Sequence, residues 1–148
     1  YQNIHANEIP IIERDRGATI RVIAGTVDGT TGPITGIVAE PTYIDVALAG
    51  DGKLVLPILR GHSAFAYLFD GEARFGAEDN TVITAPKLIV WSDGNSIEVH
   101  GEKKSARFLL VSGKPLNEPI ARYGPFVMNT QEEIQQTLRE LQQGTFAQ

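Results

Sequence analysis

The chain has 148 residues, of which 42% are hydrophobic and 21% charged, and its net charge is -5. This composition is typical of one globular domain with its own core, and the acidic balance argues against a nucleic-acid binder that depends on phosphate contacts. The chain has no cysteine, which excludes disulfides and thiolate sites and favours a reducing, cytoplasmic location, and no apolar run reaches the length of a membrane span.

Short runs of alternating apolar and polar side chains recur along the chain, as in strands with one buried face. In chain order these predicted strands are residues 19–24, 43–48, 54–58, 65–69, 81–84, 87–91, 96–100 and 107–111. Turn-forming pairs such as Asp28-Gly29 and Asp70-Gly71 separate several of them. Many short strands at near-regular spacing predict an antiparallel sandwich or barrel, and the lack of strand–helix–strand alternation argues against a parallel sheet.

Residues 25–36 are rich in glycine and are the segment most readily predicted as a long loop. A glycine-rich loop that cradles phosphate is normally followed by a Lys-Ser or Lys-Thr pair and a helix, and neither follows here. The sequence therefore favours a plain surface loop.

One helix is predicted, near the C-terminus. Thr130 and Glu133 have the spacing of a capping box, and Gly144 is a natural stop. The apolar side chains of this segment fall on one face: Ile134, Leu138 and Leu141. We expect an amphipathic helix on the outside of the β-structure.

The sequence contains no clear catalytic or metal-binding set. Its three histidines, His5, His62 and His100, have no partner at ligand spacing, and neither a cysteine nor a nucleophile-elbow serine is present. His62 fits either a lone ligand or acid/base group, or a loop histidine with one hydrogen bond, and the second interpretation is favoured. Asp45 is read as an outward charge rather than an inward carboxylate, and Trp91 as a core residue rather than a stacking platform.

Two segments of the C-terminal region carry a family resemblance. They read FLLVSGKPLNEPI at residues 108–120 and YGPFVMNTQEEI at residues 123–134, and the predicted helix follows them. With weaker support from earlier strands, the chain resembles the C-terminal half of pirin-family proteins over essentially its whole length. The resemblance implies that residues 1–148 are one cupin domain: an all-β, cupin-type antiparallel β-barrel of the jelly-roll type with one C-terminal α-helix.

The resemblance also implies where the chemistry of the parent protein lies. Pirins contain two cupins, and the family's iron or other divalent metal is held in the N-terminal cupin by three histidines and a glutamate. That half is absent from this chain. Bacterial members are associated with quercetin 2,3-dioxygenase activity, and animal members with transcriptional co-regulation.

The standard cupin metal motifs can be laid over this half of the family's sequence. Their ligand positions then fall on residues without ligand chemistry: Ile58 or Pro57, Arg60 or Leu59, Ala64, and Ser105. We therefore expect no catalytic residue, no metal and no cofactor in this domain, and an interior filled by Phe, Leu and Ile.

The leading hypothesis is a non-catalytic, metal-free domain that supports the N-terminal metal-binding cupin of a quercetin 2,3-dioxygenase-type parent. Residues 117–128 are expected to be an extended arm, because Pro115, Pro119 and Pro125 disfavour regular strand pairing. This arm and part of one sheet face would contact the missing cupin, so the chain alone should expose a large apolar patch and could form a homodimer.

Two alternatives belong to other functional classes. The first is a stand-alone cupin that binds a small ligand in a pocket lined by Arg60, His62, Tyr67 and His100, the candidate ligand-binding residues. The second is a protein-interaction or regulatory module. Neither alternative involves direct nucleic-acid binding or a membrane.

Overall fold

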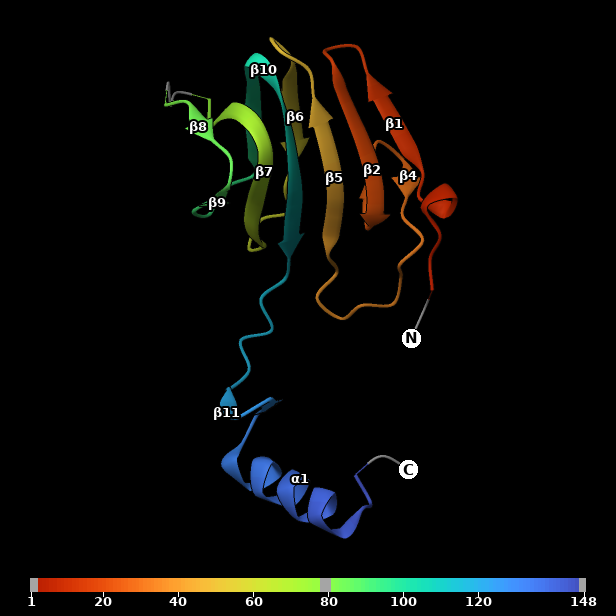
Figure 1. Ribbon diagram of the computed structural model, residues 1–148, viewed down its shortest axis with the longest axis vertical. Coiled ribbons are helices and arrows are strands. Elements are labelled where there is room, and N and C mark those ends of the chain that lie inside the picture. The colour runs from red at the N-terminus through yellow and green to blue at the C-terminus, as the bar shows by residue number, and fades with distance from the viewer. Residues whose placement is uncertain (1–2, 78–80, 147–148) are drawn as a thin grey trace. The chain divides into compact units, whose positions relative to one another are not determined.

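The computed structural model describes residues 3–77 and 81–146 and divides into two compact units, which are described separately (Figure 1). The first unit ends at Pro115 and the second begins at Leu116. In the described part of the first unit the elements are η1 (Ala6–Glu8), β1 (Ile11–Arg14), β2 (Ala18–Ala24), β3 (Thr26–Val27), β4 (Thr30–Thr31), β5 (Thr42–Leu48), β6 (Lys53–Pro57), β7 (Ser63–Phe75), β8 (Ile83–Thr84), β9 (Lys87–Val90) and β10 (Ser96–Gly113).

The strands of the main sheet pair antiparallel in the order β1-β2-β5-β10-β7-β8, with β6 added to β10 and β9 added to β7. The 18-residue β10 pairs with β6 along its first part and with β5 along its last part. The 13-residue β7 follows β10 through both parts. The sheet thus has two layers. In one, the last part of β10 lies between β5 and the first part of β7; in the other, the first part of β10 lies between β6 and the end of β7. Both long strands pass from one layer to the other, and the layers enclose the hydrophobic core.

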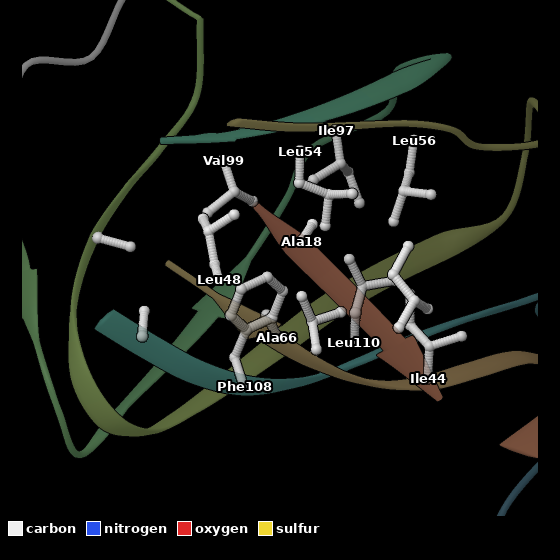
Figure 2. Close-up of a cluster of buried hydrophobic side chains, with 14 of the residues drawn as sticks. Ala18, Ile44, Leu48, Leu54, Leu56, Ala66, Ile97, Val99, Phe108 and Leu110 are labelled. Carbon is white, nitrogen blue, oxygen red and sulfur yellow. The ribbon is translucent and has the colours of Figure 1, made fainter. Parts of the chain in front are cut away.

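The core lies between these two layers. Along β2 the burial alternates strictly, as the sequence pattern predicts. Figure 2 shows Leu54, Ile97 and Val99 reaching from one layer towards Phe108 and Leu110 on the other. All five side chains are at most 3% exposed, so the interior is filled by aliphatic and aromatic groups.

Two sequence predictions for this unit were wrong, and both concern strand ends. The Asp70-Gly71 pair is not a turn between strands but lies inside β7. Gly71 has a φ of 76°, and a side chain there would collide with the Ser105 carbonyl oxygen, so this glycine serves a bend and a close backbone contact. The predicted strands 96–100 and 107–111 are one strand, β10, whose pairing with β7 shifts register between Gly101 and Ala106 and again between Arg107 and Phe108.

The second unit consists of a small hairpin and a helix. Its elements are β11 (Ala121–Tyr123), β12 (Phe126–Met128) and α1 (Gln131–Gln143). The prediction of an unpaired arm was therefore wrong for residues 121–128. Pro125 stands in the turn beside Gly124, whose φ is 54°, and Pro119 precedes β11, so neither proline removes a donor from the ladder.

The helix begins and ends as predicted. The Glu133 amide donates to the Thr130 hydroxyl at 3.2 Å, and the Glu133 carboxylate accepts from the Thr130 amide at 2.9 Å. Gly144 ends α1 with a φ of 70°. Ile134 is buried in this unit, whereas Leu141 is 51% exposed.

None of the helices in the described ranges is both long enough and apolar enough to cross a membrane.

Candidate functional site

His62 lies in the short connection between β6 and β7. Gly61 before it has a φ of 80°, and the His62 amide donates a hydrogen bond to the Leu59 carbonyl at 3.1 Å. This tight turn holds the imidazole half-buried. The side chain borders a cavity of about 480 Å³, which we call the His62 cavity.

Several hydroxyl residues that sequence analysis missed line the His62 cavity, and two of them face each other across a strand pair. Thr42 begins β5, and Ser112 lies opposite it near the end of β10. Ser112 is only 3% exposed. A signal for it was present, because Ser112 continues the inward-facing series of Phe108 and Leu110 and replaces an apolar side chain with a hydroxyl.

The glycine-rich segment 25–36 forms part of the cavity rim. It lies at the surface, as predicted, although Val27 and Gly32 are buried. Strands β3 and β4 pair as a short hairpin within it, and Ile34 forms an isolated bridge with Ala24. The loop is therefore held against the end of β2.

The structure does not bring the four candidate ligand-binding residues together. Arg60 is exposed and does not line the His62 cavity. Tyr67 points outward from β7 and is 40% exposed. His100 lines a different cavity, which shares no residue with the His62 cavity. Whether any of the four binds a ligand stays a prediction.

His100 belongs to a small charged cluster on β6 and β10. The Lys53 Nζ lies 2.5 Å from Oε1 of Glu98, and the His100 Nε2 lies 2.6 Å from the same oxygen. The hydrogen bond from Lys53, and then the one from His100, lower the pKa of Glu98 below its ordinary value of 4.5. The carboxylate is therefore held in its ionised form by two neighbours.

The positions that correspond to cupin metal ligands do not suit a metal ion. Ile58 and Ala64 are apolar, Arg60 is a cation, and Ser105 offers only a hydroxyl. Within residues 3–77 and 81–146, no group of three or more His, Asp or Glu side chains is placed to hold a metal.

Asp45 faces outward from β5, as predicted, but its side chain is only 16% exposed. Its Oδ2 lies 2.8 Å from the Arg107 Nη2 and 4.0 Å from the Arg21 Nη1. Its Oδ1 is buried and has no hydrogen-bond partner among the described residues. The outward-facing carboxylate of Asp45 is therefore largely covered, and only its Oδ2 has a partner among the described residues.

Beside Asp45 the outward side of the sheet is apolar. Phe65 pairs with Val90 and Tyr67 with Leu88, so all four side chains share one face of β7 and β9. Phe69 continues this face, and the Arg107 guanidinium lies 5.2 Å from its ring centre. We call these five apolar residues the aromatic face; they are 36% to 71% exposed.

Trp91, which directly follows β9, is partly buried and packs on the core, as predicted. Its ring centre lies 6.0 Å from that of Phe75.

Comparison with known proteins gives a consistent result. A family model described as the pirin C-terminal cupin domain matches residues 43–147. A pirin-like protein of Solanum lycopersicum is 36% identical over 146 residues, which cover 97% of this chain and 49% of the relative. Pirin of Homo sapiens is 36% identical over 141 residues, which cover 93% of this chain and 48% of that protein. The chain thus spans about half the length of these curated relatives.

Solved structures show the same relationship. The crystal structure of a quercetin 2,3-dioxygenase from Acinetobacter baumannii aligns with a TM-score of 0.87 at 31% identity, over 99% of this chain and 50% of that one. An RmlC-like cupin from Shewanella frigidimarina aligns over 77% of this chain and 91% of its own, with a TM-score of 0.53 at 10% identity, and shows a likeness of fold alone. The predicted all-β cupin fold with one C-terminal helix is confirmed.

Proposed function

This chain belongs to the pirin family as a C-terminal cupin domain, and from this premise we propose that it is the non-catalytic half of a two-cupin protein. Its role is to pack on a preceding domain and stabilise it. The iron or other divalent metal lies in that preceding domain, and the parent protein is a dioxygenase of the kind named for the Acinetobacter relative.

The aromatic face is the observation that carries this proposal. Leu88 and Val90 are 61% and 71% exposed, and they lie directly beside the half-exposed rings of Phe65 and Tyr67. Each Å² of such surface that is removed from water contributes about 25 cal/mol. A contiguous apolar patch on a sheet face is a typical protein–protein contact surface.

The charged residues beside the aromatic face favour binding to a specific partner over non-specific hydrophobic association. Arg107 reaches both the Phe69 ring and the Asp45 carboxylate. The buried Oδ1 of Asp45 lacks a hydrogen-bond donor in the described part of this chain. Because buried polar atoms are almost always satisfied, a donor from a docked domain is the natural complement.

The proposed occupant of the aromatic face is the preceding cupin. The matched family model is that of a C-terminal domain, and the relatives named above are about twice as long as this chain. A domain covalently joined to this one is present at a high effective concentration, so even a modest apolar contact would stay closed.

Two valine substitutions in the polypeptide that contains both domains test this proposal. Val90→Asp places a charge on the aromatic face, whereas Val38→Asp places the same charge on an exposed loop residue; the two valines are 71% and 78% exposed. Calorimetry of the Val90→Asp protein should show two unfolding transitions in place of one, because the contact loses about 2 kcal/mol or more. Val38→Asp should leave the transition unchanged.

Two results would contradict the proposal. One is a single unchanged transition in the Val90→Asp protein. The other is self-association of the parent protein that Val90→Asp abolishes while the two domains remain coupled, which would assign the aromatic face to a homodimer. Sedimentation of both variants distinguishes these cases.

A further inference from the structure

The His62 cavity lies at the end of the β-layers where β5 begins and β10 ends. Its volume of about 480 Å³ lies in the range typical of small-molecule sites. None of the residues of the aromatic face lines it. Its function is therefore separable from the proposed domain contact.

Part of the cavity wall is aliphatic. Two of its residues, Ile37 and Leu59, are 45% and 65% exposed, although they stand at a concave surface. Ile58 forms the deeper wall and packs against the core. A ligand with an apolar body would cover these side chains and release the water that contacts them.

The cavity lining contains several hydroxyl side chains, but Glu40 is the one Asp, Glu, Lys or Arg residue among its described lining residues. Within the described part of the chain the Glu40 carboxylate has no hydrogen-bond or ion-pair partner. The Glu40 amide donates to the Ile37 carbonyl at 3.0 Å, and Glu40 has a φ of 46°, so a tight turn holds it at the rim.

A second, smaller cavity of about 170 Å³ adjoins the first through His62 and Ile58, which line both. It adds Asp93 and the indole of Trp91, and it too is lined by no lysine or arginine. A carboxylate and an indole ring are both groups that attract organic cations. Both cavities therefore favour a positively charged ligand over a negatively charged one.

We propose that the His62 cavity binds a small organic cation. The apolar body of the ligand lies on Ile37, Ile58 and Leu59, and its ammonium group is balanced by Glu40. His62 and the buried hydroxyl of Ser112 are positioned to form the remaining hydrogen bonds.

Three simple probes of nearly equal shape test the charge preference: benzylamine, benzyl alcohol and benzoate. Each is titrated into the isotope-labelled protein, in the longest polypeptide that its gene encodes, while backbone amide resonances are followed by NMR. Benzylamine should shift the amides of Ile37, Leu59 and Ser112 saturably. Benzoate should bind about tenfold more weakly than benzylamine, and benzyl alcohol should lie between them.

Substitutions assign the binding to individual side chains. Glu40→Gln should lower the preference for benzylamine over benzyl alcohol by about fivefold, because it removes only the charge. His62→Ala should weaken the binding of both probes by a similar factor. His100→Ala removes a histidine from a different cavity and should change neither affinity.

Several results would overturn the proposal. They are benzoate binding as tightly as benzylamine, affinities that His62→Ala and Glu40→Gln leave unchanged, or amide shifts confined to residues outside the His62 cavity. Well-dispersed spectra of each variant establish that a loss of binding is not a loss of fold.

Discussion

Glu98 illustrates how two neighbours fix the charge of one side chain. Lys53 and His100 both reach its Oε1, and together they lower its pKa. A carboxylate whose pKa is lower in the folded state stabilises the fold above its unfolded pKa. That contribution is lost as the pH falls through the folded value. The affected window therefore begins near the ordinary value of 4.5 and extends below it.

Glu98→Gln should consequently destabilise the protein at neutral pH. The difference in unfolding free energy between wild type and variant should shrink as the pH falls through this window, because the wild-type carboxylate then becomes protonated as well. Urea unfolding of both proteins at a series of pH values measures this difference. A difference that stays constant with pH would show that the charge of Glu98 does not contribute.

Some residues of the candidate site could be predicted from the sequence, and others could not. His62 could be singled out by its residue type, and the structure places it at a cavity. Ser112 and Glu40 could not be, because their roles depend on which strand ends and loops meet, and those contacts join residues far apart in the chain. For the same reason, the sequence could not show whether Arg60, Tyr67 and His100 lie near His62, and none of the three lines the His62 cavity.

Among the elements, alternation of apolar and polar residues predicted most of the strands. It identified β2 and β5 nearly to their ends. Alternation could not indicate that β7 and β10 continue through glycines, because a glycine in a bend and a glycine in a turn look alike in sequence. The helix was predicted almost fully, since its capping box and terminal glycine are local signals.

Gly71 is the most demanding of the backbone positions in β7. Gly71→Ala should lower the free energy of unfolding by roughly 3 kcal/mol or more. The new side chain would be held at a left-handed φ and would collide with the Ser105 carbonyl oxygen. Gly61→Ala is the matched control: its φ is 80°, but its side chain would enter open space, so it should cost only about 1 kcal/mol. Denaturant unfolding measures both values.

Equal losses of unfolding free energy in Gly71→Ala and Gly61→Ala would contradict this explanation of the bend in β7. They would mean that the close approach of β7 to β10 at Gly71 relaxes freely, and that the bend does not depend on a residue without a side chain.

For the whole molecule, the proposed division of labour between two cupins predicts how metal content responds to substitution. His62→Ala and His100→Ala in the parent protein should leave its bound metal unchanged, because neither histidine belongs to a cluster of ligands within the described residues. Elemental analysis of the purified variants measures this content. A stoichiometric loss of metal in either variant, or stoichiometric iron bound to the 148-residue chain alone, would contradict the proposal.

The central claim is that the aromatic face packs on the preceding domain, and hydroxyl-radical footprinting tests it most directly. Labelling of Phe65, Tyr67 and Leu88 is compared between the parent protein and the 148-residue chain, with the exposed loop residue Val38 as the reference. The account predicts strong protection of the three face residues in the parent and equal labelling of Val38 in both. Equal labelling of all four residues in the two proteins would contradict it.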